Sequence, residues 1–273
     1  MTARVDAATA VSPPRGLDPT LPAATQRPRA SITPSSVPPP ATPPRVSIAL
    51  HDVSKVYPNG RTALADVDLV VPEGDFVFLV GPSGAGKSTM IKLLVRDELA
   101  TSGEVYIAGF ELGNLGSRDI PKLRRQIGIV FQDFKLLPRK TVRENVAFAL
   151  EVTGTPRRRI AATVEQALAL VGLTDQAEQR PNQLSGGEQQ RTAIARAMVH
   201  DPRVIIADEP TGNLDPLISW EIIQLLLRIN DMGTTVLMAT HNAEVVTALR
   251  KRVVALEDGR LVRDEVGGYH RDY

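Results

Sequence analysis

The stretch Gly81-Pro-Ser-Gly-Ala-Gly-Lys-Ser-Thr89 has the G-x-x-x-x-G-K-[ST] spacing of a phosphate-binding loop. Its glycines have no Cβ, so the backbone can curl and direct successive N–H groups at phosphate oxygens. Lys87 adds a positive charge for the outer phosphates, and Ser88 offers a hydroxyl to a magnesium ion. The sequence therefore predicts a site for a nucleoside triphosphate with Mg²⁺. The residues of this site are Gly81, Pro82, Ser83, Gly84, Ala85, Gly86, Lys87, Ser88 and Thr89.

The residues on either side of this loop have the pattern that the motif requires. Asp75 to Val80 is apolar enough to form a buried strand, and Met90 to Val95 has the pattern of a helix. The positive N-terminal end of that helix would face the same anion as the loop. A glycine-rich turn with an accidental lysine is the alternative, and it leaves the flanking strand and helix without explanation.

Length and composition exclude several classes of protein. The 273 residues suffice for one large domain or two small ones. The absence of cysteine excludes disulfides and thiolate metal sites. The net charge of +1 argues against a nucleic-acid binder driven by bulk electrostatics, so no nucleic-acid partner is predicted. No run approaches the roughly eighteen apolar residues of a membrane span, so a membrane role needs a second chain.

The N-terminal part of the chain differs from the rest. Met1 to Arg45 holds eleven of the twenty-one prolines, with Ser, Thr and Ala between them. We interpret it as a disordered or extended tail ahead of a domain that covers residues 46–273. The tail has no apolar core of the kind that a secretory signal needs, so a cytoplasmic protein is predicted.

Four apolar runs show no alternation, which is typical of strands buried on both faces of a parallel sheet. Each run ends on a residue or loop with useful chemistry. Ligands of open α/β sheets bind at the carboxyl ends of the strands, so these endings predict one shared site. The runs are Phe76 to Val80, Ile127 to Phe131, Val204 to Ala207 and Thr235 to Ala239, and they end at Gly81, Gln132, Asp208-Glu209 and His241.

Other segments predict the parts around this sheet. Val67 to Val71 alternates apolar and polar residues, as in the antiparallel edge of a larger sheet. Residues 118–180 are mainly helical in pattern, most clearly at Thr141 to Leu150 and Arg157 to Val171, and a hairpin turns at Asp258-Gly259. The predicted fold is α/β, a P-loop NTPase core with a mixed central sheet, an antiparallel β edge subdomain and a helical insertion subdomain.

Polar residues at the predicted strand ends have candidate roles. Asp208 is placed to hold magnesium through its water shell, and Glu209 can accept a hydrogen bond from the attacking water and act as general base. A turn-forming Asp-Glu-Pro is the alternative for this pair. Gln132 could reach the metal or the water, and His241 the terminal phosphate, although a surface glutamine and a structural histidine are common. Tyr57 could stack on a purine ring or could simply end a strand.

The stretch Leu184-Ser-Gly-Gly-Glu188 is the second informative one. Ser185, with Glu188 three residues later, is a capping box before a helix that runs to about Met198. Gly186 and Gly187 cost that helix about 1 kcal/mol each relative to alanine, so something should require the bare backbone, and a phosphate is the obvious candidate. Either both anion-binding helix ends face one nucleotide in a monomer, or the second completes the site of another subunit in a two-fold pair.

Six motifs follow one another in the chain: Gly81 to Thr89, Gln132, Leu184 to Glu188, Val204 to Glu209, Asn213-Leu214-Asp215 and His241. In type and order they resemble the motifs of an ABC-type ATPase, over about residues 46–263. The resemblance implies a homodimer that sandwiches two MgATP, with Leu184 to Glu188 of one subunit closing on the phosphate loop of the other. It also implies that adenine stacks on Tyr57 and that Asp215 lies at the dimer seam.

Within this family the closest resemblance is to the ATPases of bacterial cell division, carried by stretches such as Ile120 to Arg125 and Ala207 to Asp215. ATPases of lipoprotein-release and macrolide-export systems share several of these stretches and are the alternative. The resemblance implies an integral membrane partner that holds the chain on the inner face of the membrane. A helix of that partner would dock beside Gln132, unless the apolar residues there are core of the helical insertion. Those residues are Phe131, Phe134, Leu136 and Leu137.

Overall fold

The structure is a computed structural model that describes residues 45–267. The predicted tail, Met1 to Arg45, lies outside this range except for Arg45 itself. The described residues form two β-sheets that share one hydrophobic core, and a second core lies on the other face of the larger sheet.

The larger sheet contains the four apolar runs as neighbouring parallel strands, which confirms the predicted parallel sheet. Its strands are β3 (Phe76–Val80), β6 (Ile127–Phe131), β7 (Val204–Asp208), β8 (Thr235–Ala239), β9 (Arg252–Glu257) and β10 (Arg260–Val266). They lie in the order β10-β9-β3-β8-β7-β6. Only β10 is antiparallel to its neighbour, so the sheet is mixed, as predicted.

Strand β3 shows why these runs lack alternation. Phe76, Phe78 and Val80 enter the core formed with the helices on one face, whereas Val77 and Leu79 enter the core on the other face. All five side chains are buried. Because both faces of the strand are covered, apolar residues are favoured at every position rather than at every second one.

The smaller sheet is antiparallel, with strands in the order β2-β1-β4-β5. Its strands are β1 (Val46–Val56), β2 (Thr62–Pro72), β4 (Ser102–Ile107) and β5 (Phe110–Glu111). The prediction that Val67 to Val71 forms the edge of the larger sheet is wrong, because these residues pair with β1 in a sheet of their own. Alternation shows that one face of a strand is buried, but it does not show which strand lies beside it.

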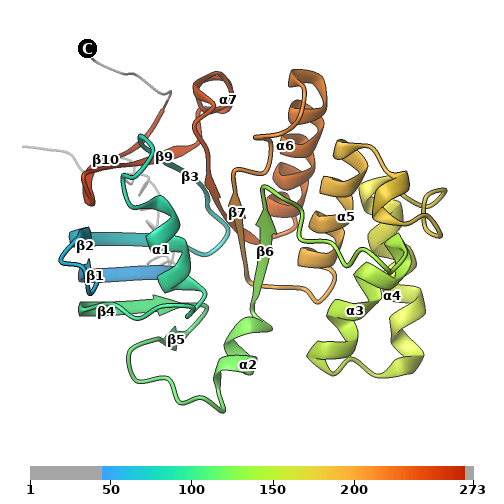
Figure 1. Ribbon diagram of the computed structural model, residues 1–273, viewed down its shortest axis with the longest axis horizontal. Coiled ribbons are helices and arrows are strands. Elements are labelled where there is room, and N and C mark those ends of the chain that lie inside the picture. Colours follow the sequence, from blue (N-terminus) through green and yellow to red (C-terminus); the bar gives the residue numbers. More distant parts are fainter. Residues whose placement is uncertain (1–44, 268–273) are drawn as a thin grey trace, which may run out of the picture. The chain divides into compact units, whose positions relative to one another are not determined.

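Helices cover the larger sheet on both faces, with α1 on the side of the smaller sheet and α3 to α6 on the other (Figure 1). The helix α3 begins with a capping box between Thr141 and Glu144, and both α3 and α4 end at a glycine with positive φ. Residues 118–180 also contain β6 of the larger sheet. The helices are α1 (Lys87–Leu94), α2 (Ile120–Arg124), α3 (Val142–Thr153), α4 (Arg157–Val171), α5 (Gly186–Met198), α6 (Pro216–Asp231) and α7 (Ala243–Leu249).

The predicted C-terminal hairpin is present, and its turn supports the phosphate loop from behind. Gly259 N–H donates to the carbonyl of Ala85 (3.1 Å), and the carbonyl of Gly259 accepts from Ala65 N–H (2.9 Å). A Cβ on Gly81 would lie 2.2 Å from the carbonyl oxygen of Leu256 in β9. The loop therefore packs directly against the backbone of the last two strands.

Candidate active site

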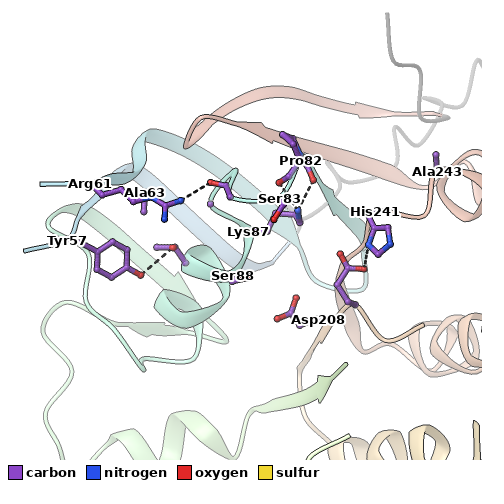
Figure 2. Close-up of a pocket in the computed structure, with 15 residues that line it drawn as sticks. Tyr57, Arg61, Ala63, Pro82, Ser83, Lys87, Ser88, Asp208, His241 and Ala243 are labelled. Carbon is purple, nitrogen blue, oxygen red and sulfur yellow. Dashed lines mark hydrogen bonds and ion pairs between the residues drawn. The ribbon is translucent and has the colours of Figure 1, made fainter. Parts of the chain in front are cut away.

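A cavity of about 850 Å³ opens at the carboxyl ends of β3, β7 and β8 (Figure 2). This volume is within the usual range for a nucleotide-sized ligand. The residues that line it come from the phosphate loop, from the ends of these strands and from the turn between β1 and β2. They are Tyr57, Arg61, Ala63, Gly81, Pro82, Ser83, Gly84, Gly86, Lys87, Ser88, Thr89, Asp208, Glu209, His241 and Ala243.

The phosphate loop leaves donors free for an anion. Gly86 is the N-cap of α1, with φ 111°, and no side chain caps the helix, so the first-turn N–H groups face the loop. The ammonium of Lys87 donates to the carbonyls of Gly81 (2.7 Å) and Pro82 (3.1 Å). An ammonium has three N–H donors, so one remains for a phosphate oxygen.

Asp208 ends β7 and carries an electrostatic penalty. Its burial and the charge of the adjacent Glu209 raise the pKa of Asp208, and Lys87 only partly opposes them. Oxygen ligands suit Mg²⁺, and a cation beside Asp208 would relieve this penalty. Ser88 lines the same cavity, so the two oxygen donors fit a magnesium site.

We expect Asp208→Asn to raise the melting temperature of the nucleotide-free protein. A carboxyl group with a higher pKa in the folded chain favours folding when protonated, and this contribution is lost as the pH rises through the folded-state pKa. The ionised Asp208 therefore destabilises the fold at neutral pH. Each kcal/mol gained should shift the melting temperature by about 2–4 °C in differential scanning fluorimetry.

The exposed Glu73 supplies the control for this prediction. Glu73→Gln also removes one carboxylate, but from a solvated site, so the melting temperature should stay within about 1 °C of the parent. A lower melting temperature for Asp208→Asn would contradict the penalty assigned to burial.

His241 contacts Glu209 at one end of the cavity (Figure 2). The Nδ1 atom of His241 lies 2.8 Å from Oε2 of Glu209. Glu209 has φ 48°, a left-handed conformation that non-glycine residues rarely adopt, and its N–H donates to the carbonyl of Ala239 at the end of β8. Strained backbone of this kind is concentrated at functional sites. The neighbouring strand thus fixes the direction of the Glu209 side chain.

Tyr57 lies at the opposite end of the cavity, where its hydroxyl is 3.4 Å from the hydroxyl of Thr89 (Figure 2). The same cavity end includes Arg61, whose guanidinium approaches the carbonyl of Gly84 at 3.5 Å. Sequence reasoning missed Arg61, because its position in the turn after β1 gives no motif and only the fold brings it to the loop.

Gln132 does not line this cavity. The side-chain amide of Gln132 donates to Oδ1 of Asn213 (3.4 Å), and the main-chain carbonyl of Gln132 accepts from the side-chain amide of Asn213 (3.4 Å). A Cβ on Gly212 would lie 2.8 Å from Nε2 of Gln132. The end of β6 is therefore packed against the segment that follows β7 and precedes α6.

The stretch Leu184 to Glu188 also lies away from the cavity of its own chain. Ser185 and Glu188 form the expected capping box, and the hydrogen bonds from Ser185 lower the pKa of Glu188. Asp215 is the N-cap of α6, where it accepts from Leu217 N–H (3.1 Å) and Ile218 N–H (3.0 Å). The starts of α5 and α6 are thus both closed by a side-chain cap.

Packing against α6 requires one of the two glycines at the start of α5. A Cβ on Gly187 would lie 2.6 Å from Cγ2 of Ile218, whereas a Cβ on Gly186 would meet only the end of the Leu214 side chain at 3.1 Å. We expect Gly187→Ala to lower the free energy of unfolding by about 1–2 kcal/mol in urea, because overpacking exceeds the gain in helix propensity. Gly186→Ala is the control and should be close to neutral.

Ile218→Ala tests the cause of that loss. If the clash is responsible, the double variant Gly187→Ala, Ile218→Ala should be more stable than the sum of the single effects by at least about 0.5 kcal/mol. Additive losses would show that Gly187 is required for another reason.

The fold and the site together define an ABC-type ATPase. Residues 64–212 match the family model described as ABC transporter, and the chain belongs to this family. Within it, the chain is similar over most of its length to curated relatives described as cell division ATP-binding proteins FtsE. The chain is thus a member of the FtsE family.

These relatives come from several bacteria. The FtsE of Streptococcus pneumoniae D39 is 57% identical over 221 residues, which cover 81% of this chain and 96% of the relative. The FtsE of Mycobacterium tuberculosis is 54% identical over 224 residues, covering 82% and 97%. The FtsE of Escherichia coli K12 is 46% identical over 214 residues, covering 78% and 96%.

The chain also resembles a solved structure of an ATP-binding cassette. The dimeric ATP-binding cassette MJ0796, in a post-hydrolysis state bound to ADP and Pi, superposes with a TM-score of 0.73. It is 38% identical in sequence, and the match covers 81% of this chain and all of that chain.

Among the helices of residues 45–267, none has the length and apolar character needed to span a membrane.

Proposed function

We propose that this ATPase is the ATP-hydrolysing subunit of a membrane-associated cell-division complex of the FtsE–FtsX type. It would pair as a homodimer on the cytoplasmic face of the membrane, held there by an integral membrane partner that resembles FtsX. The observation that carries the proposal is the meeting of Lys87, Asp208, Glu209 and His241 at one cavity, in a chain whose relatives are named for cell division.

One ATP would span the cavity, with its base at one end and its phosphates at the other. The base would stack on Tyr57, and the phosphates would lie in the loop from Gly81 to Thr89, where backbone N–H groups and Lys87 face them. The free end of α1 adds the positive end of a helix dipole. Binding at this site therefore uses an apolar platform for the base and oriented donors for the charge.

The Mg²⁺ ion would be held by Ser88 and, through water, by Asp208. Bound there, it would neutralise charge that develops on the phosphates. Gln132 is the third candidate ligand, and it would have to leave Asn213 to reach the metal. Asp208 fits this role because burial and Glu209 already disfavour its ionised form in the free protein.

Glu209 would act as general base for the attacking water. Its carboxylate is held at 2.8 Å from His241, so one residue orients the base and can also contact the terminal phosphate. The strained backbone at Glu209 fixes the carboxylate toward the cavity rather than along the strand.

Dimer closure would complete the site. Leu184, Ser185, Gly186, Gly187 and Glu188 of one subunit would face the phosphates bound by the other, and Asp215 would lie at the seam between them. Closure driven by ATP would move the membrane partner, which would regulate cell-wall hydrolysis outside the cell. Phe131, Phe134, Leu136 and Leu137 would meet a cytoplasmic helix of the partner beside Gln132.

Purification of the full-length chain from detergent-solubilised membranes tests the proposed partner. We expect a permease that resembles FtsX to copurify. The amount of copurified permease should rise when the Glu209→Gln variant is purified in the presence of MgATP. Recovery of a lipoprotein-release or macrolide-export permease in its place would favour that alternative.

A further inference from the structure

Glu98, in the loop between α1 and β4, contacts three side chains beside the nucleotide cavity. Its Oε1 accepts from the hydroxyl of Tyr57 (3.1 Å) and from the ammonium of Lys92 (3.2 Å). Its Oε2 lies 3.2 Å from the ammonium of Lys55. The Glu98 side chain is only 21% exposed, so these contacts are partly shielded from water. Glu98 thus joins Tyr57, which follows β1, to α1, the helix that starts at the phosphate loop.

The charges of this cluster hold Glu98 in its ionised form. Partial burial opposes ionisation, but the hydrogen bonds from Lys92 and Tyr57 and the nearby ammonium of Lys55 outweigh it and lower the pKa of Glu98. The same contact raises the pKa of Lys92. An ionised carboxylate accepts a stronger hydrogen bond than a neutral group does, so the hydroxyl of Tyr57 is firmly held.

The remaining contacts of Tyr57 fix its ring further. The hydroxyl of Tyr57 gives its only hydrogen to Glu98, so in the 3.4 Å contact with Thr89 it is Thr89 that donates. The ammonium of Lys55 lies 5.1 Å from the centre of the Tyr57 ring, and it also donates to the carbonyl of Leu99 (2.8 Å). The ring is therefore held at its hydroxyl by Glu98 and Thr89 and over part of its face by Lys55, and of these three only Thr89 lines the cavity.

We propose that Glu98 is a positioning residue for the nucleotide base, which acts by holding the ring of Tyr57 at a fixed distance from the phosphate loop. The proposal rests on the proposed stacking of the base on Tyr57. A ring fixed before binding loses less rotamer freedom on binding, so its orientation improves affinity without any contact between Glu98 and the nucleotide. Because the contact is made to the platform, it should affect the binding of the base and leave the binding of the phosphates unchanged.

The test compares a ligand that has a base with one that lacks it. Isothermal titration calorimetry on the full-length chain would measure the dissociation constants of MgADP and of magnesium pyrophosphate. We expect Glu98→Ala to weaken MgADP about 3–10-fold, as for loss of one hydrogen bond, and to leave pyrophosphate within about 2-fold. In steady-state hydrolysis the KM for ATP should rise by a similar factor while kcat stays within about 2-fold.

Two further variants separate the hydrogen bond from the charge. Glu98→Gln should restore most of the MgADP affinity, because its amide oxygen can still accept from Tyr57. Asp97→Ala, the matched control, removes a carboxylate from the neighbouring position and should leave MgADP affinity within about 2-fold. Tyr57→Phe should weaken MgADP as much as Glu98→Ala does, and the two changes together should be no worse than either one.

Three results would overturn the proposal. Pyrophosphate affinity that falls together with MgADP affinity would assign Glu98 to the folding of α1. If Glu98→Gln lowers the MgADP affinity as much as Glu98→Ala does, the charge of Glu98 and not its hydrogen bond to Tyr57 is responsible. If Glu98→Ala leaves the MgADP affinity unchanged while Tyr57→Ala lowers it strongly, Glu98 has no positioning role, although the base still stacks on Tyr57. If Tyr57→Ala itself has no effect, the stacking on which the proposal rests is wrong as well.

Discussion

Replacing Glu209 with glutamine should lower the rate of ATP hydrolysis by about 10²–10⁴-fold, the usual contribution of a general base. Glutamine has nearly the same size and can keep a contact with His241, but its amide does not accept a proton at neutral pH. ATP binding, which depends on the loop around Lys87, should be retained. Phosphate release measured with the membrane partner present gives the rate, and size-exclusion chromatography with MgATP should show an accumulated dimer.

Glu244→Gln is the control for this variant. Glu244 lies in the first turn of α7, close to His241 in the chain, and its side chain is exposed. It carries the same charge but has no contact with the nucleotide cavity, so its hydrolysis rate should stay within about 2-fold of the parent. Normal hydrolysis by Glu209→Gln would remove Glu209 from the role of base. Failure of that variant to dimerise with saturating MgATP would contradict the composite site.

Gly81→Ala should weaken ATP binding by more than about 100-fold and lower the free energy of unfolding by about 2–5 kcal/mol. The new Cβ would lie 2.2 Å from the carbonyl oxygen of Leu256, and Gly81 has φ 146°, which an L side chain rarely adopts. Leu256 is paired in β9 of the larger sheet, so its backbone cannot move away without loss of ladder hydrogen bonds. Calorimetry with MgADP and urea unfolding would measure the two effects separately.

Gly233→Ala separates backbone strain from the clash. Gly233 has φ 103°, lies in the turn before β8, and has no atom within 4 Å of the added Cβ. This change should cost about 1–2 kcal/mol of stability and leave MgADP affinity unchanged. If Gly81→Ala bound MgADP like the parent, the close approach of Leu256 would have no role in shaping the loop.

The strands of the larger sheet could be predicted from the sequence because burial on both faces imposes a local rule. Val204, Ile205, Ile206 and Ala207 are all fully buried, and no polar residue fits among them. The smaller sheet was placed wrongly because the alternation at Val67 to Val71 depends only on one covered face. Which strand lies beside it is decided by contacts that are distant in the chain.

The candidate site could be predicted as a set of positions more readily than as a set of contacts. Strand ends bring Asp208 and His241 to one cavity, since parallel strands end at the same edge. The same reasoning places Gln132 at that edge, but its side chain bonds to Asn213. No local sequence pattern indicates which partner a side chain will bind. Glu98 could not be recognised either, because its partners come from two segments on opposite sides of the phosphate loop.

The hydrogen bond between Gly259 and Ala85 has a bearing on how the protein is made. The phosphate loop precedes β9 and β10 in the chain, so the ribosome releases the loop before the hairpin. In the interval the growing chain carries the ATP-binding sequence without the strands that pack against it. A nucleotide can therefore stabilise the braced form of the loop only after both strands of the hairpin have been made.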